Sequence, residues 1–148
     1  MKKFLKILLI IFLIGSSCSI VKAEDNEQTF YENAIQNYKA GNIIEAKTNI
    51  WKAISLNKQE INYYVLLAMI HQKDGDYAQA ERVLMMAKML DPENLRVYEF
   101  LGHNEFYQGN FESAINYYTY AKKLKTATPQ DKKRLDDYII DTRNTKKL

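Results

Sequence analysis

The chain has 148 residues, of which 47% are hydrophobic and 26% are charged, a composition typical of one folded globular domain. Five glycines, two prolines and one cysteine exclude a low-complexity chain, an internal disulfide framework and a zinc finger built from several cysteines. The formal charge of +3 includes Lys2, Lys3, Lys6 and Lys22, which precede every acidic residue; without these four lysines, 17 basic and 18 acidic side chains remain. A chain with a net charge near −1 lacks the basic character of a general nucleic-acid-binding protein, so we expect no nucleic-acid partner.

Residues 1–23 have the three-part pattern of a secretory signal peptide. A short basic head is followed by an unbroken apolar run at 7–14 and by a small and polar segment that ends at Ala23. Eight apolar residues are too few for a membrane-spanning helix, which needs roughly 20. We therefore expect cleavage after Ala23 and export to the periplasm or the outside of a bacterial cell.

Cys18 supports a second interpretation, in which the segment is a bacterial lipoprotein signal. Such signals carry an aliphatic residue three places before the lipidated cysteine and two small residues in between. Two serines fill the small positions here, but Gly15 stands at the aliphatic position and Ile14 lies one place too early. Lipidation of Cys18 would make the chain an outer-membrane lipoprotein, whereas cleavage after Ala23 removes the only cysteine and any thiol chemistry with it.

A five-point pattern recurs three times between residues 27 and 128, and the spacing between copies is constant. It consists of an aromatic residue, a glycine, an alanine, a bulky residue and a second alanine. The three copies are Phe30, Gly41, Ala46, Ile50 and Ala53; Tyr64, Gly75, Ala80, Leu84 and Ala87; and Tyr98, Gly109, Ala114, Tyr118 and Ala121. The constant spacing, for example between Gly41, Gly75 and Gly109, is the period of a repeated helix-turn-helix unit.

Physical reasons support two helices in each unit. The small residues allow two helices to cross closely, and each glycine begins a turn in which a positive φ is useful. Apolar residues recur at three-and-four spacing after the second glycine, for example at Tyr77, Ala80, Leu84 and Ala87. Pro92 cannot continue the preceding helix, so it separates the second unit from the third.

The pattern resembles the tetratricopeptide repeat, whose period has the same length. In the unit that begins at Ile61, the family's large aromatic, leucine and small residue appear as Tyr64, Leu67 and Ala68, and the unit closes with Asp91-Pro92. The first unit departs most, with Asn33 in place of the leucine, and the third ends without the proline. The resemblance implies an all-α solenoid wound as a right-handed superhelix.

Three repeats are expected within residues 24–128, at about 27–60, 61–94 and 95–128. Residues 129–148 are predicted to form a capping helix and a basic tail, because Pro129 can open a helix and an apolar face follows at Leu135, Tyr138, Ile139 and Thr142. The charged residues of this helix, Arg134 among them, are expected to face solvent. Seven helices are predicted in total.

No catalytic site, metal site or cofactor is predicted. His71 and His103 are the only histidines, and packing is the expected role of His71. Glu99 precedes His103 by four residues on one helical face, but no third ligand stands at metal-binding spacing. Phosphate-binding loops and nucleophile motifs are also absent from the sequence, so we do not expect an enzyme.

Proteins of the tetratricopeptide family bind peptides in a concave groove lined by the first helix of each unit. Carried over place by place, the resemblance implies the groove residues Tyr31, Ile35, Tyr38, Val65, Met69, Gln72, Arg96, Glu99, His103, Phe106 and Tyr107. Aromatic side chains with few charges suit an apolar or aromatic-bearing segment. Several of these side chains could instead pack between the units, Tyr38 and Phe106 foremost.

A second surface is predicted on the convex side, where the second helices normally carry polar residues. Here the outward places hold Trp51, Met85, Met86, Met89 and Tyr120. A patch of methionines and aromatics suits contact with a partner protein or self-association. The alternative is that the N-terminal extension buries these side chains, or that their exposure is simply tolerated.

The expected function is a non-enzymatic adaptor or scaffold in the bacterial envelope that binds a peptide segment or a partner protein in the groove. The alternative is a lipid-anchored structural subunit of an envelope secretion, pilus or assembly complex. In that case the convex patch would make the contact.

Overall fold

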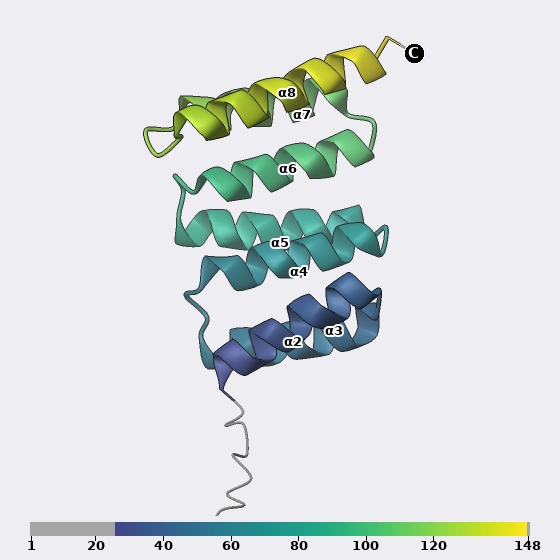
Figure 1. Ribbon diagram of the computed structural model, residues 1–148, viewed down its shortest axis with the longest axis vertical. Coiled ribbons are helices and arrows are strands. Elements are labelled where there is room, and N and C mark those ends of the chain that lie inside the picture. Colours follow the sequence, from purple (N-terminus) through teal and green to yellow (C-terminus); the bar gives the residue numbers. More distant parts are fainter. Residues whose placement is uncertain (1–25, 148) are drawn as a thin grey trace, which may run out of the picture.

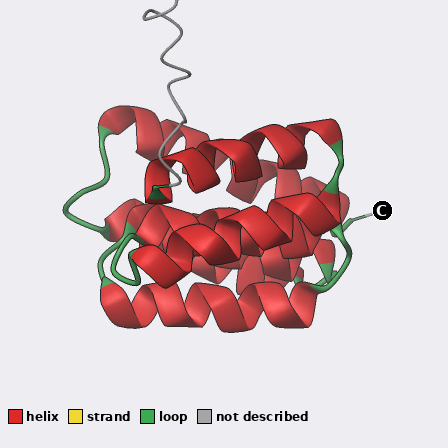
Figure 2. Cartoon of the chain, turned by 90° about the horizontal axis from the view of Figure 1, so that it is seen from below, coloured by secondary structure: helices red, strands yellow, loops and turns green. Residues whose placement is uncertain are grey.

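The computed structural model describes residues 26–147, which form seven α-helices and no strand. In chain order the helices are α2 (Glu27–Ala40), α3 (Ile43–Leu56), α4 (Ile61–Lys73), α5 (Tyr77–Leu90), α6 (Leu95–Tyr107), α7 (Phe111–Lys123) and α8 (Pro129–Thr145). They stack from α2 at one end of the long axis to α8 at the other (Figure 1), and the view along that axis shows helices throughout the described part (Figure 2). The predicted signal peptide and Cys18 lie outside the described residues.

The helices follow the fixed period of the sequence. The first helices α2, α4 and α6 begin at Glu27, Ile61 and Leu95, and the second helices α3, α5 and α7 begin at the same constant spacing. Three helix pairs and a final single helix therefore form the stack. The predicted all-α solenoid with seven helices is confirmed for the described residues. None of these helices is long and apolar enough to cross a bilayer.

Each turn within a helix pair depends on a glycine with left-handed backbone geometry. The φ angles are 84° at Gly41, 78° at Gly75 and 80° at Gly109, and no other residue of the described part has a positive φ. No atom lies within 4 Å of the position that a Cβ would take at these three glycines. The backbone conformation alone therefore explains why the sequence places glycine there.

Small residues line the crossings between the helices of the stack. Eight alanines are completely buried: Ala34, Ala46, Ala53, Ala68, Ala80, Ala87, Ala114 and Ala121. Gly102 occupies the place in α6 that corresponds to Ala34 and Ala68, and a Cβ there would lie 2.3 Å from Cε1 of Tyr118. The first two pairs combine an alanine with Ile50 or Leu84, whereas the third combines glycine with the larger tyrosine. The third pair thus matches a larger ring with a smaller partner.

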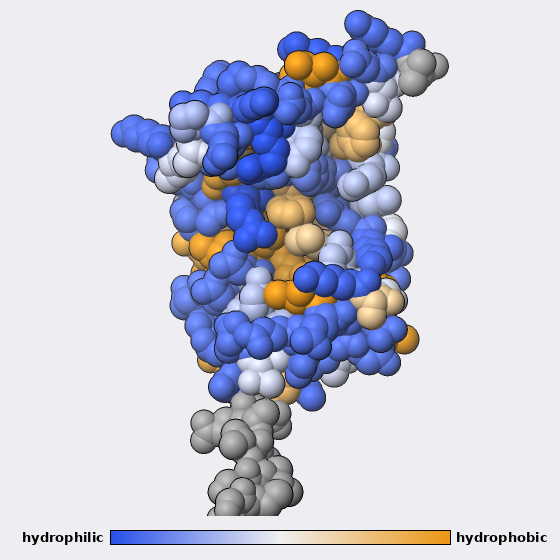
Figure 3. Space-filling model, viewed as in Figure 1, coloured by the Kyte–Doolittle hydropathy of each residue, from blue (hydrophilic) through white to orange (hydrophobic). Residues whose placement is uncertain are grey.

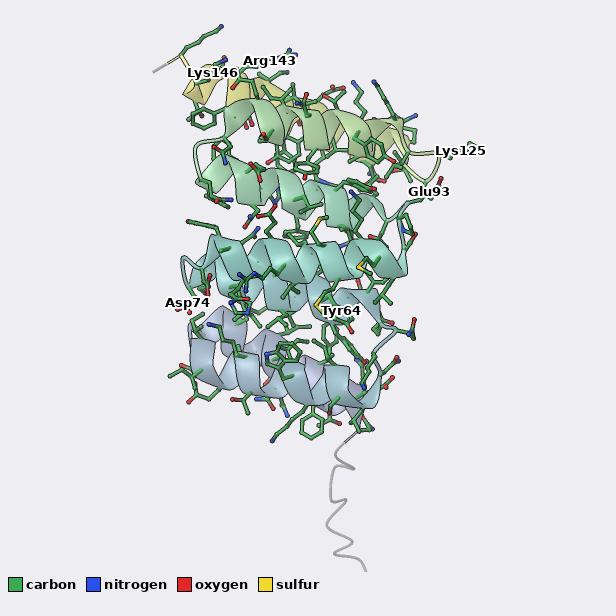
Figure 4. All side chains as sticks on the ribbon, turned by 180° about the vertical axis from the view of Figure 1, so that it is seen from behind. Tyr64, Asp74, Glu93, Lys125, Arg143 and Lys146 are labelled. Atoms are coloured by element: carbon green, nitrogen blue, oxygen red, sulfur yellow. The ribbon has the colours of Figure 1, made fainter. Side chains whose placement is uncertain are left out.

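In α4 and α6 the recurring aromatic residue is a tyrosine, and it anchors the loop that precedes its helix. The hydroxyl of Tyr64, labelled in Figure 4, donates a hydrogen bond to the carbonyl of Lys58 at 2.9 Å, and the hydroxyl of Tyr98 donates to the carbonyl of Pro92 at 2.7 Å. Both tyrosines are buried. Each hydroxyl therefore satisfies a loop carbonyl between two helix pairs, which fixes how one pair follows the next.

Helix α8 covers the end of the stack as predicted. Its N-terminus is fixed by a capping box between Thr128 and Asp131, with a proline in the first turn. Leu135, Ile139 and Thr142 are buried along the face of α8 that packs on the core. A solvent-exposed helix with one apolar face closes the core and leaves polar groups outside.

One charged residue of α8 does not face solvent freely, contrary to the expectation from sequence. Arg134 donates to both carboxylate oxygens of Glu99 in α6, from Nε at 3.1 Å and from Nη2 at 2.9 Å, and also to Asp131 at 2.8 Å. Only 7% of Glu99 is exposed. This bidentate ion pair joins α8 to α6 and satisfies a carboxylate that burial would otherwise destabilise.

We expect Gly102→Ala to destabilise the protein because the added methyl group overlaps the Tyr118 ring. Overpacking costs about 1–3 kcal/mol, whereas the same change in an unhindered helix would gain about 1 kcal/mol. The double variant Gly102→Ala with Tyr118→Leu would combine an alanine with a leucine, as Ala68 and Leu84 do in the second pair. It should therefore be more stable than the sum of the two single changes predicts. Urea denaturation gives the free energy of unfolding of each variant. A Gly102→Ala single variant that is more stable than the original protein would contradict the account.

We also expect Glu99→Gln to lower the free energy of unfolding by about 1–2 kcal/mol, because it removes the charge that Arg134 pairs with at a buried site. The matched control is Glu112→Gln, since Glu112 in α7 pairs on the surface with Lys146, the residue that follows the end of α8. An exposed pair of this kind contributes about 0.5 kcal/mol or less. Equal losses in the two variants would show that the Glu99–Arg134 pair has no special role in holding α8.

Candidate functional site

The first helices α2, α4 and α6, together with α8, form one face of the stack, which is the face turned toward the viewer in Figure 1. The space-filling view shows hydrophobic side chains gathered near the middle of this face, with hydrophilic ones around them (Figure 3). Three cavities open among these helices, and we refer to them together as the groove. The face therefore combines apolar surface with concave shape.

The central cavity has a volume of about 440 Å³ and is bounded by α2, α4, α5 and α6. Its lining residues are Tyr38, Met69, Gln72, Lys73, Tyr77, Phe100, His103 and Tyr107. The loop cavity, of about 590 Å³, is lined by Asp91, Glu93, Asn94, Leu95, Arg96, Glu99, Phe100, Thr126, Asp131 and Arg134. The cap cavity, of about 180 Å³, is lined by His103, Phe106, Tyr107, Tyr118, Tyr138, Asp141 and Thr142. Shared residues connect the central cavity to each of the other two.

An amide network fixes the side chains at the central cavity. Gln72 of α4 donates to the carbonyl of Phe100 at 3.2 Å and to Oδ1 of Asn104 at 3.3 Å. Asn104 is completely buried and donates to the carbonyl of Tyr77 at 3.1 Å. A satisfied buried network of this kind holds α4, α5 and α6 in a single arrangement.

Lys73 is the only charged side chain that lines the central cavity. Its ammonium donates to the carbonyl of Tyr38 at 2.8 Å and lies 4.7 Å from the centre of the Tyr38 ring. A cation at this point stabilises the C-terminal carbonyls of α2 and contacts the face of an aromatic ring. Within the described residues, Lys73 forms no ion pair with a carboxylate.

Tyrosine rings pack against one another between the helices, and one such pair lines the central cavity. Tyr31 of α2 packs against Tyr63 of α4 with ring centres 4.9 Å apart, and Tyr77 stacks with Tyr107 at 6.1 Å. Burial raises the pKa of Tyr31 and of Tyr38, so their hydroxyls stay protonated at neutral pH. Such side chains offer both flat apolar area and a hydrogen-bonding group.

Most of the groove residues predicted from the sequence lie at these cavities: Tyr38, Met69, Gln72, Arg96, Glu99, His103, Phe106 and Tyr107. Tyr38 and Phe106 also pack against the core. Tyr31 and Ile35 are half-buried against the core and line none of the three cavities. The prediction is wrong for Val65, because this side chain is 1% exposed and belongs to the core.

Glu99 and His103 do not form the pair that their spacing suggested. The Glu99 carboxylate is taken by Arg134 and has no free charge to offer a ligand. The His103 ring packs edge-on against Phe100, Tyr118 and Tyr138, with ring centres 5.3, 5.6 and 4.9 Å away. Burial lowers the pKa of His103. No cluster of three potential metal ligands exists among the described residues.

The sequence prediction missed the parts of the groove that do not come from the first helices. Tyr77 reaches the central cavity from the start of α5, and α8 supplies Arg134, Tyr138, Asp141 and Thr142. The apolar face of α8 signalled that the helix packs on the stack. Only the structure shows that α8 also forms a wall of the groove.

The predicted convex patch is exposed on the second helices. Figure 4 views the molecule from behind, the side of α3, α5 and α7. Trp51, Met85, Met86, Met89 and Tyr120 are all exposed, with Met89 at 83%. Tyr120 also contacts Tyr98, with ring centres 4.4 Å apart, so part of its surface is used within the stack.

Comparison with known proteins agrees with the period and the fold. Residues 61–94 match the family model described as tetratricopeptide repeat. No curated protein matches the sequence.

Several solved structures share the fold at low sequence identity. PcrH from Pseudomonas aeruginosa is 18% identical, with 86% of this chain and 98% of that chain covered and a TM-score of 0.71. The translocator chaperone SycD of Yersinia enterocolitica is 17% identical, with 85% and 98% covered and a TM-score of 0.73. The first tetratricopeptide domain of Spaghetti (RPAP3) is 18% identical, with 76% and 91% covered and a TM-score of 0.65. The sequence match over residues 61–94 and the shared fold together support the tetratricopeptide repeat family.

Proposed function

We propose that the groove binds an extended segment of a partner protein and that the chain is a non-enzymatic adaptor built from three tetratricopeptide repeats. The observation that carries the proposal is the continuity of the three cavities along α2, α4, α6 and α8. Phe100 lines both the central and the loop cavity, while His103 and Tyr107 line both the central and the cap cavity. A segment lying along this face would meet all three cavities in turn.

The chemistry of the groove favours an apolar or aromatic-bearing segment. Tyr107 is 60% exposed and stacks on Tyr77, so its ring is held in place and still accessible. Rigid aromatic side chains contribute much of the binding energy at protein interfaces. The Gln72–Asn104 network at the central cavity orders the site before a partner arrives, which lowers the entropic cost of binding.

Structures with this fold support a peptide-binding role. PcrH has been crystallised with the chaperone-binding region of PopD, and SycD with a peptide of the translocator YopD. The tetratricopeptide domain of Spaghetti (RPAP3) has been solved with an HSP90 peptide. These proteins bind segments of other chains, which supports the binding of such a segment by the chain described here.

Export to the bacterial envelope is also part of the proposal, on the basis of the signal-peptide pattern at residues 1–23. The mature protein is then a periplasmic or secreted adaptor that begins at Glu24. Mass spectrometry of the protein recovered from its native cells tests this assignment. A lipid-modified chain beginning at Cys18 would instead establish an outer-membrane lipoprotein, and an unprocessed chain would contradict both forms of the proposal.

The second candidate function is a structural subunit that contacts a larger envelope complex, or another copy of itself, through the convex patch. The exposure of Trp51, Met86 and Met89 favours it. Methionine and aromatic side chains adapt to a partner surface. The two candidates use opposite faces of the stack, so substitutions on one face discriminate between them.

Peptides selected from a displayed library of random sequences against the protein should bind the groove. Tyr107→Ala should weaken their binding about tenfold, since it removes an exposed aromatic contact. Met89→Ala, on the convex patch, is the matched control and should leave the affinity unchanged. Fluorescence anisotropy of labelled peptides measures both variants. Peptides that lose affinity on Met89→Ala but not on Tyr107→Ala would move the binding site to the convex patch.

A further inference from the structure

The cap cavity differs in character from the rest of the groove. It lies where α6, α7 and α8 meet, and five of its lining side chains carry rings: His103, Phe106, Tyr107, Tyr118 and Tyr138. The ring centres of Tyr118 and Tyr138 are 5.4 Å apart, and Phe106 meets Tyr107 at 5.7 Å. These contacts fix the rings, so the aromatic wall exists before any ligand binds.

One unpaired negative charge borders this wall. Asp141 of α8 is the only ionised side chain among the cavity residues, it is exposed, and it makes no ion pair within the described part of the chain. Lys146 is engaged by Glu112. Arg143 lies about 200° further round α8, because each residue turns a helix by about 100°. No basic side chain of α8 therefore compensates Asp141.

No other lining residue of the cavity carries a positive charge that would oppose Asp141. The cavity lies beside Tyr107, the last residue of α6, where the helix dipole places partial negative charge. Burial raises the pKa of Tyr118 and of Tyr138 and lowers that of His103. At neutral pH the tyrosines stay protonated and the histidine stays uncharged, so no cation occupies the ring cluster.

We infer that the cap cavity binds a cationic side chain, arginine or lysine, of the segment that occupies the groove. Aromatic ring faces attract cations, and a carboxylate beside them adds Coulomb attraction and a hydrogen-bond acceptor. The inference rests on the proposed function, because it assigns one residue type of the bound segment to one end of the groove. Tyr107 borders both the central and the cap cavity, so neighbouring residues of the segment can enter each.

The other two cavities do not suit a cation as well. The central cavity contains Lys73, which would repel one. In the loop cavity, Glu99 and Asp131 already pair with Arg134. The other two carboxylates of this cavity, Asp91 and Glu93, lie in a cavity that has Phe100 as its single aromatic ring and Arg96 as a second cation. An aromatic wall together with an unpaired carboxylate therefore occurs only at the cap cavity among the three cavities of the groove.

Two small probes that differ in charge but hardly in shape test this site. The amide of N-acetylarginine carries the guanidinium, and the amide of N-acetylcitrulline is its neutral counterpart. NMR titration of the protein should show shifts around Tyr107 and Thr142, with the arginine probe binding roughly fivefold more tightly, as a partly exposed cation–π site with a carboxylate predicts. Asp141→Asn should remove most of this difference. Asp137→Asn, one turn earlier on α8 and outside the cavity, should preserve it.

Equal binding of the two probes, an unchanged preference in Asp141→Asn, or no shift with either probe would overturn the inference. The proposed function fails in a different way, when no displayed peptide binds the groove at all. If peptides do bind there without any enrichment of arginine or lysine, the groove stands and the cation site is refuted. The two claims are thus tested by separate readouts.

Discussion

The structure depends on the close crossing of helices at small residues. The eight buried alanines and Gly102 allow neighbouring helices to pack closely. The three glycine turns set the direction of each second helix. Because these elements repeat at a fixed period, every pair joins the next in the same way. The first helices then fall on one face of the stack and the second helices on the other. The groove and the convex patch are both consequences of this packing.

Helix α8 serves the fold and the groove with different faces. Leu135 and Ile139 close the core, while Tyr138 and Asp141 line the cap cavity. The pairing of Arg134 with Glu99 links the two roles, since it holds α8 against α6 and forms part of the loop-cavity wall. A terminal helix that completes a groove in this way adds chemistry that the repeats do not contain. The aromatic rings beside Asp141 are the clearest instance.

The period allowed the helices, their order and their turns to be predicted, because those features depend on residues at fixed spacing in the sequence. The surface or core position of single side chains could not be predicted in the same way. Val65 stands at a groove place but is buried, since the packing of neighbouring helices decides its exposure. Glu99 was assigned to the groove, but its partner Arg134 lies in a different part of the sequence, on α8. Contacts between distant segments of this kind leave no periodic signal.

The central claim is that a partner protein meets the groove and not the convex patch. Site-specific photo-crosslinking in the native cells tests it most directly, with the photoreactive residue p-benzoylphenylalanine placed either at Tyr107 or at Met89. Both side chains are exposed, and they lie on opposite faces of the stack. The account predicts a crosslinked partner from position 107 and none from position 89. A partner captured only from position 89 would contradict it.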